Sequence, residues 1–242
     1  RHRSVSRGLG DVYKRQVMGN LGEKLIEELQ CETVFSIGGI GISESVVVTW
    51  IIMAVVLIVC LLLTRNLKVE NPGRGQLLLE FAVSWVQNLC GGFIGEEGKR
   101  YTPYLASVLI YLGIANLIGI LGFKPPTKDL NVTAALAIMS IVLIQYAGIR
   151  KKGAKGWLKS FAEPVAIVAP INILELVIKP LSLCMRLFGN VLGAFVIMKL
   201  IESVLPVFLP VVFSAYFDLF DGLIQAYVFV FLTGLFIKEA IE

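Results

Sequence analysis

The fold is decided by residues 164–198, which read PVAIVAPINILELVIKPLSLCMRLFGNVLGAFVIM. Its only charged residues are Glu175, Lys179 and Arg186. As one helix this run would be about 52 Å long at about 1.5 Å per residue, whereas the hydrocarbon core of a bilayer is roughly 30 Å thick. The sequence therefore predicts a membrane-embedded helix that tilts steeply, kinks at Pro170 or Pro180, or protrudes.

The composition of the whole chain agrees with a bilayer as its solvent. Of its 242 residues, 56% are hydrophobic and 17% are charged, and the mean hydropathy is +0.79. A soluble domain of this size cannot bury so much apolar surface. The net charge of +4 comes from short loops between long uncharged runs, so nucleic-acid binding is excluded. The four cysteines and the single histidine lack the spacing of a metal site or a disulfide framework, and we expect no metal or cofactor.

Four more apolar runs are long enough to cross a membrane. Three are uncharged, namely Val46–Leu63, Tyr101–Phe123 and Asn131–Ile149. The last, Val211–Ile237, carries charge only at Asp218 and Asp221. Ser203–Pro210 contains two prolines and separates it from the long run before it. We therefore expect the last two crossings to form a long, strongly tilted helical hairpin.

Residues Gln76–Leu89 predict a helix of a different kind. Gln76, Glu80, Ser84 and Gln87 share one helical face, and the opposite face carries large apolar residues. This pattern is typical of an amphipathic helix lying along the membrane surface, or of a short helix packed on a loop. With the surface helix, the sequence predicts an all-α membrane protein of five transmembrane helices plus one amphipathic helix.

Basic residues predict the orientation of the chain. Basic residues follow the first crossing and the third crossing, precede the second, and stand at the end of the last. If the five crossings alternate in direction, all these basic residues lie on one side of the membrane. Such loops face the cytoplasm, which places the N-terminus outside and the C-terminus inside.

Residues 1–17 differ from everything that follows. They are basic, lack an apolar run and resemble a cloning or read-through remnant. We expect this segment to be disordered and foreign, with Met18 as the true start, although a genuine basic arm is the alternative. Residues 18–242 are then expected to form a single polytopic membrane domain.

Arg186 is the most informative polar residue inside the predicted crossings. A charge at the centre of a bilayer costs about 2.5–3.5 kcal/mol on insertion scales, so such residues are usually functional. Helical spacing places it on one stripe with Lys179, Ser182, Asn190 and Gly193. A second stripe on the last helix contains Ser214, Asp218, Asp221 and Gln225. Two polar stripes on one hairpin predict a hydrated path whose acids relay protons.

Other interpretations of these residues remain open. Arg186 could pair with Asp218 or Asp221 and only hold two helices together, as in a structural scaffold. It could also bind an anionic substrate in a stand-alone secondary transporter. Glu175 either lines a water-filled path or pairs with Lys179 four residues later.

Three stretches resemble one known family. The block Arg186–Asn190 (RLFGN), preceded by Lys179–Leu183 (KPLSL), resembles the arginine-bearing helix of subunit a of the F-type ATP synthase. Pro126–Thr133 resembles the loop of that family that enters the next span, and Leu223–Phe229 resembles its last helix. The resemblance covers the chain from about Ser43 to its end, in the same order.

The resemblance implies a non-catalytic, ion-translocating stator subunit in a bacterial plasma membrane. Its partners would be a ring of small carboxylate-bearing hairpin subunits, a peripheral-stalk subunit, membrane lipid and, indirectly, the soluble ATPase head. Arg186 would separate two proton half-channels, with Asn190 and Gln225 beside it. The further candidates for half-channel lining are Glu175, Lys179, Ser182, Gly193, Ser214, Asp129 and Asn131. The choice between H⁺ and Na⁺ would lie largely in the ring.

Two positions depart from the pattern of the family. Phe195 stands where many members have a glutamate, and Asp218 stands where many have a histidine. We interpret the two changes as linked, so that the carboxylate of the outer half-channel has moved from one helix to its neighbour.

Overall fold

The computed structural model describes residues 33–37, 40–65, 73–95, 97–121, 125–161, 169–204, 213 and 215–242. Residues 1–17 lie outside this part of the chain. The long helices are α2 (Glu44–Thr64), α3 (Arg74–Ile94), α4 (Thr102–Leu117), α5 (Leu130–Ser160), α6 (Ala169–Val204) and α8 (Gly222–Ile241). Short helical turns occur at Lys99–Tyr101, Ile118–Leu121 and Pro126–Lys128, and Ala215–Asp221 is a π-helix. The prediction of an all-α membrane protein is confirmed.

A small β-hairpin precedes the helices. β1 (Thr33–Ile37) pairs antiparallel with β2 (Ile40–Ser43), with Ile37 opposite Ile40. These two strands were not predicted from the sequence, since each has only four or five residues. β2 leads directly into α2 at Glu44.

Five described helices are long and apolar enough to cross a membrane: α2, α3, α5, α6 as far as Met198, and Leu219–Ile241. α4 has only 16 α-helical residues, but it continues into the 3-10 turn Ile118–Leu121. At about 1.5 Å and 2.0 Å per residue, the two together reach about 32 Å, enough to cross a hydrocarbon core.

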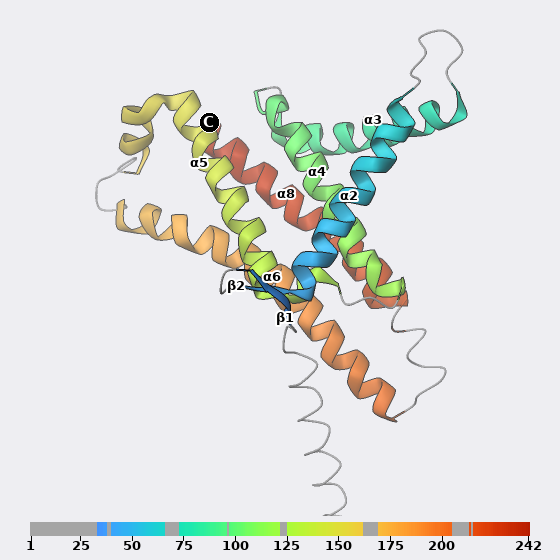
Figure 1. Cartoon of the computed structure of the whole chain (residues 1–242). Coiled ribbons are helices and arrows are strands. Elements are labelled where there is room, and N and C mark those ends of the chain that lie inside the picture. The colour runs from blue at the N-terminus through green and yellow to red at the C-terminus, as the bar shows by residue number, and fades with distance from the viewer. Residues whose placement is uncertain are drawn as a thin grey trace, which may run out of the picture.

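The position of α3 distinguishes it from the crossing helices, although its length and composition do not. Figure 1 shows α3 lying across one end of the bundle, in contrast to the lengthwise course of α4 and α8. Val86, Cys90 and Ile94 are buried against the bundle. Leu78 and Phe81 are 69% and 72% exposed, as expected of side chains that enter lipid.

α5 is longer than the predicted crossing at Asn131–Ile149 because a second helical segment follows it. Gly153 interrupts the helix with φ = +75°, a conformation that favours glycine. After this break the chain folds back, and Trp157 Nε1 donates a hydrogen bond to Gln145 Oε1 at 2.9 Å. The basic loop that follows this crossing is therefore partly helical.

α6 contains 36 residues and reaches about 54 Å, as the apolar run predicted. Pro170 lies in its first turn, where a proline is well tolerated, and Pro180 lies inside the helix. In Figure 1 α6 and α8 both run obliquely across the molecule, side by side with opposite chain directions, as expected for a tilted hairpin.

The core lies where α8 packs against α3, α4 and α5, while α6 packs mainly on α5. Leu105, Leu112, Phe229 and Val230 are completely or almost completely buried there. Gly234 permits a close approach of α3 to α8, since a Cβ at this position would lie 3.0 Å from the Phe93 ring. One side of α6 is consequently left uncovered along most of its length.

Candidate functional site

Packing on α5 sets the direction in which α6 presents its polar residues. Leu183, Cys184 and Leu187 are buried, and Cys184 Sγ lies 3.6 Å from Thr133 Oγ1 of α5. Met185, one position before Arg186, is 50% exposed. Arg186 therefore stands at the border between the packed and the open side, and its side chain is partly exposed.

Gln225 joins α8 to α6 at the level of Arg186. Its side chain is 4% exposed, and its Nε2 donates a hydrogen bond to the backbone carbonyl of Arg186 at 3.0 Å. The family resemblance implied that Gln225 lies beside Arg186, and the structure brings the two residues together. The contact fixes the backbone of Arg186 and leaves the guanidinium available to other groups.

The guanidinium has no acidic partner among the described side chains. Asp221 is partly buried at the end of the π-helix, but no ion pair joins it to Arg186. Ser214 and the side chain of Asp218 lie outside the described part of the chain. A pair between Arg186 and Asp218 therefore stays a prediction.

The last helix is not α-helical over the whole predicted stripe. Ala215–Asp221 is a π-helix, whose hydrogen bonds join residues five apart, and α8 begins only at Gly222. The α-helical spacing used for Ser214 to Gln225 holds only from Gly222 onward. Asn116 of α4 supports this junction, because its Nδ2 donates to the Gly222 carbonyl at 2.8 Å.

The open side of α6 carries small and polar residues around Arg186. Ser182, Gly189 and Asn190 are exposed, and Gly193 is partly exposed. A Cβ added at Gly189 or Gly193 would meet no described atom within 4 Å apart from its own stretch of α6. Close approach by another molecule is sterically permitted along this face.

Asp129 has a structural role that the sequence interpretation missed. It is 2% exposed and caps α5, accepting a hydrogen bond from Asn131 N at 2.9 Å. Its other oxygen accepts from Ser43 Oγ at 2.9 Å, which ties the β-hairpin to α5. Both carboxylate oxygens are thus used within the fold, whereas the side chain of Asn131 is exposed.

Phe195, the residue that departs from the family pattern, contacts a buried cation. Lys128 is 8% exposed, and its Nζ lies 3.5 Å from the centre of the Phe195 ring. Such cation–π contacts favour an ammonium group taken out of water. The loop before α5 is thereby joined to α6 two to three turns beyond Arg186.

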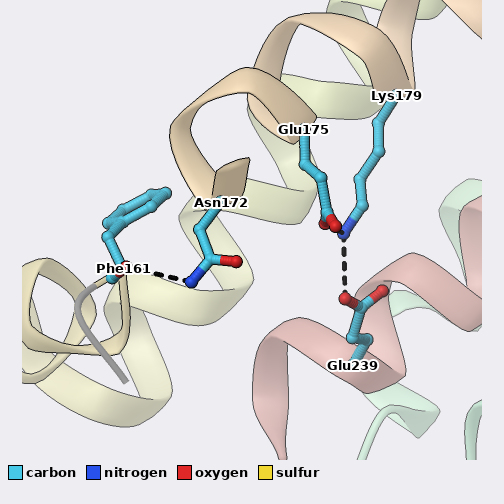
Figure 2. Close-up of polar contacts among 5 residues, drawn as sticks. All are labelled: Phe161, Asn172, Glu175, Lys179 and Glu239. Carbon is cyan, nitrogen blue, oxygen red and sulfur yellow. Dashed lines mark hydrogen bonds and ion pairs between the residues drawn. The ribbon is translucent and has the colours of Figure 1, made fainter. Parts of the chain in front are cut away.

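Glu175 and Lys179 belong to a cluster with a third residue, Glu239 of α8. Figure 2 shows Lys179 Nζ directed at both carboxylates, 2.9 Å from Glu239 Oε1 and 3.2 Å from Glu175 Oε2. The pairing of Glu175 with Lys179 that spacing allowed is therefore present. Ion pairs this exposed contribute only about 0.2–1 kcal/mol, so stability alone explains little of the arrangement.

A cavity of about 240 Å³ lies beside this cluster, between the ends of α5, α6 and α8. The three charged residues line it together with Lys152, Gln145 and Asn172. Asn172 Nδ2 donates to the Phe161 carbonyl at 2.9 Å, which ties the first turns of α6 to the end of α5 (Figure 2). At about 30 Å³ per molecule, the cavity has room for several waters, and its lining offers them partners.

Glu239 escaped the sequence interpretation because it lies 60 positions from Lys179 along the chain. Its only sequence signal was its place at the end of the last helix, among residues expected at the membrane surface. The spacing rules relate residues on one helix and do not relate residues on different helices.

Comparison with known proteins identifies the family. The model of the family described as "ATP synthase A chain" matches residues 46–238. "ATP synthase subunit a" of Moorella thermoacetica is 39% identical over 210 residues, which cover 86% of this chain and 95% of that one. "ATP synthase subunit a 2" of Bradyrhizobium sp. strain BTAi1 is 38% identical over 209 residues, covering 86% and 93%. "ATP synthase subunit a, sodium ion specific" of Propionigenium modestum is 30% identical over 226 residues, covering 87% and 78%. The chain therefore belongs to the ATP synthase A chain family.

Proposed function

We propose that this chain is the ion-translocating stator subunit of a rotary ATP synthase, in which Arg186 separates two proton half-channels. The observation that carries the proposal is the setting of Arg186. Its guanidinium is partly exposed beside an open face of α6 and has no acidic partner among the described side chains. If Arg186 only joined two helices, its guanidinium would instead form an ion pair with an acidic side chain of this same protein.

The properties of arginine suit this role. A guanidinium keeps its proton at physiological pH and cannot act as a relay, whereas a lysine in a dry place can become neutral. A carboxylate at ~4 Å in a medium of effective dielectric constant about 20 gains about 4 kcal/mol from the attraction, before desolvation. A ring carboxylate that reaches Arg186 is thus favoured in its ionised form and gives up its proton. The fixed charge also opposes direct passage of a proton between the half-channels.

The open face of α6 would be the surface against which the ring moves. Gly189 and Gly193 allow close approach, and Ser182 and Asn190 keep the path polar on either side of Arg186. An oblique helix of about 54 Å follows a curved ring over more subunits than an upright helix does. The peripheral stalk and, indirectly, the soluble ATPase head would complete the complex, and this chain would carry out no ATP chemistry itself.

The half-channel on each side has its own acids. On the side of the basic loops, which we assign to the cytoplasm, Glu175 and Lys179 line the cavity between α5, α6 and α8. On the other side we assign the relay to Asp218, with Asp221 close to it in the sequence. Asp129 is removed from the relay because its oxygens cap α5 and hold Ser43.

A stand-alone secondary transporter that binds an anion at Arg186 is the competing function. The two are separated by purifying the chain from its native membrane under mild conditions. We expect it to be recovered with a ring of short hairpin proteins and a soluble ATPase, and to transport nothing when reconstituted alone. Anion uptake by the isolated chain in liposomes, lost in Arg186→Ala, would favour the transporter.

The coupling ion is tested in the same preparation. One relative is named sodium ion specific, which describes that protein. We propose protons for this chain, and ATP-driven acidification of vesicles should proceed at full rate without added sodium. Pumping that requires sodium would show that the ring carries Na⁺.

A further inference from the structure

We propose that Glu239 is a proton-exchange residue at the cytoplasmic mouth of the path, sharing this task with Glu175 across Lys179. This inference rests on the proposed function and adds a residue of α8 to a half-channel otherwise built from α6. It concerns the cavity of about 240 Å³ between α5, α6 and α8.

The first support is geometric. Lys179 Nζ lies within 3.2 Å of one oxygen from each of two carboxylates, which come from different helices. Lys152 also lines the cavity, so two ammonium groups and two carboxylates surround one space of about 240 Å³. The two carboxylates therefore offer oxygen atoms to a proton in the lining of the same cavity as the ammonium groups.

The second support is the connection to Arg186. Lys179, Ser182 and Arg186 are spaced three and four residues apart on α6, and therefore follow one another along the same face of the helix. Lys179 lies about 10 Å from Arg186 along the helix axis. Ser182, which is exposed, lies between them. Ser182 thus places an exposed polar group between the arginine and the cavity, next to the buried Leu183.

The third support is access to bulk water. The side chain of Glu239 is 58% exposed and that of Glu175 is 47% exposed, whereas that of Lys179 is 22% exposed. The lysine is the inner member of the cluster and the acids are the outer members. A proton that leaves a ring carboxylate near Arg186 would cross cavity water, bind a carboxylate oxygen of Glu239 or Glu175, and then pass to bulk water.

The chain offers a matched control in Glu242. It lies three residues further on and is 69% exposed, and its carboxylate lies 3.7 Å from Lys238 in an ordinary surface pair. It is absent from the lining of the cavity. Neutralising Glu242 changes the net charge of this surface as much as neutralising Glu239, without touching the cluster.

The test uses inverted vesicles containing the whole ATP synthase, with ATP-driven proton uptake followed by a fluorescent dye and normalised to assembled complex. A positioned proton-transfer group can contribute about 100-fold or more, and because Glu175 remains, we expect roughly a tenfold slower uptake in Glu239→Gln. The double variant with Glu175→Gln should be slower again, and Glu239→Asp should keep most of the rate. Glu242→Gln should match the unmodified chain.

A second readout distinguishes proton exchange from a structural role. A membrane-impermeant buffer such as MES, raised at constant ionic strength on the cytoplasmic side, should restore uptake in Glu239→Gln. Uptake equal to that of Glu242→Gln, or a loss that MES does not relieve, would overturn the inference. If Arg186→Ala still abolishes coupling in that case, the stator assignment stands and only the role of Glu239 is wrong.

Discussion

Gln225 donates a hydrogen bond through Nε2 to the backbone carbonyl of Arg186, 3.0 Å away, and so joins α8 to α6 at the level of the one arginine in the α6 crossing. α6 and α8 each pack against α5, whereas they contact each other directly at few positions. The position of the arginine thus depends on a buried amide from the neighbouring helix.

Removing this amide should loosen the site. In Gln225→Leu the Arg186 carbonyl loses a buried donor, which we expect to cost about 1–3 kcal/mol of stability. Proton pumping should fall more than assembly, because the arginine loses its fixed position. Thermal unfolding of the purified complex and dye-monitored pumping measure the two effects. Gln87→Leu, an exposed position on α3, is the control, and equal behaviour of the two variants would contradict the proposed contact.

Asp129 should prove to be a structural residue. Asp129→Ala removes the cap of α5 and the acceptor for Ser43, and we expect a loss of about 0.5–2 kcal/mol in stability. The proton flux of each assembled complex should stay unchanged. Asn131→Ala should leave stability unchanged, because its side chain is exposed and the backbone N–H that donates to Asp129 remains. A large loss of flux in stable Asp129→Ala complexes would return Asp129 to the proton path.

Two glycines should respond in opposite ways to added side chains. A Cβ at Gly222 would lie 2.9 Å from Asn116 Cβ, so Gly222→Ala forces a backbone shift that typically costs about 1–3 kcal/mol. A Cβ at Gly193 meets nothing within 4 Å, so Gly193→Leu should leave the stability of the chain unchanged. If the ring passes along this face, Gly193→Leu should slow ATP synthesis roughly tenfold, equal to about 1.4 kcal/mol. Normal synthesis in Gly193→Leu would place the ring elsewhere.

Asp218 should be essential if the outer carboxylate has moved from the position of Phe195 on α6 to the π-helix that precedes α8. We expect Asp218→Ala to lose proton-driven ATP synthesis in assembled complexes. A glutamate placed at position 195 in the same variant should restore part of it. The restoration should be partial because Lys128 Nζ, 3.5 Å from the Phe195 ring, would pair with the new carboxylate. Full ATP synthesis in the single variant Asp218→Ala would refute the hypothesis that Asp218 replaces the carboxylate missing at position 195.

The hydropathy of the chain was sufficient to predict its helices, because long uncharged runs have few alternatives to membrane crossing. The amphipathic pattern likewise predicted α3. Neither hydropathy nor the amphipathic pattern could predict where a helix departs from regular α-helical geometry. The break at Gly153 and the π-helix before Gly222 depend on packing with other helices, since the donor to the Gly222 carbonyl comes from Asn116 of α4.

The site was predictable where it follows one helix and unpredictable where it joins several. Lys179, Ser182 and Arg186 share a face because α-helical spacing requires it. Glu239 reaches Lys179 only through the packing of α6 and α8 on α5, which no local pattern specifies. Asp129 did carry a usable signal, since an aspartate immediately before an apolar helix is a common N-cap.

The most direct measurement is ATP synthesis and ATP-driven proton pumping in vesicles whose complexes carry Arg186→Ala. We predict that the complex assembles, because Arg186 forms no ion pair with any described side chain, and that both coupled activities are lost. Arg186→Lys should also lose coupling, because a lysine can give up its proton. Coupled synthesis that persists in Arg186→Ala would contradict the central role of the arginine.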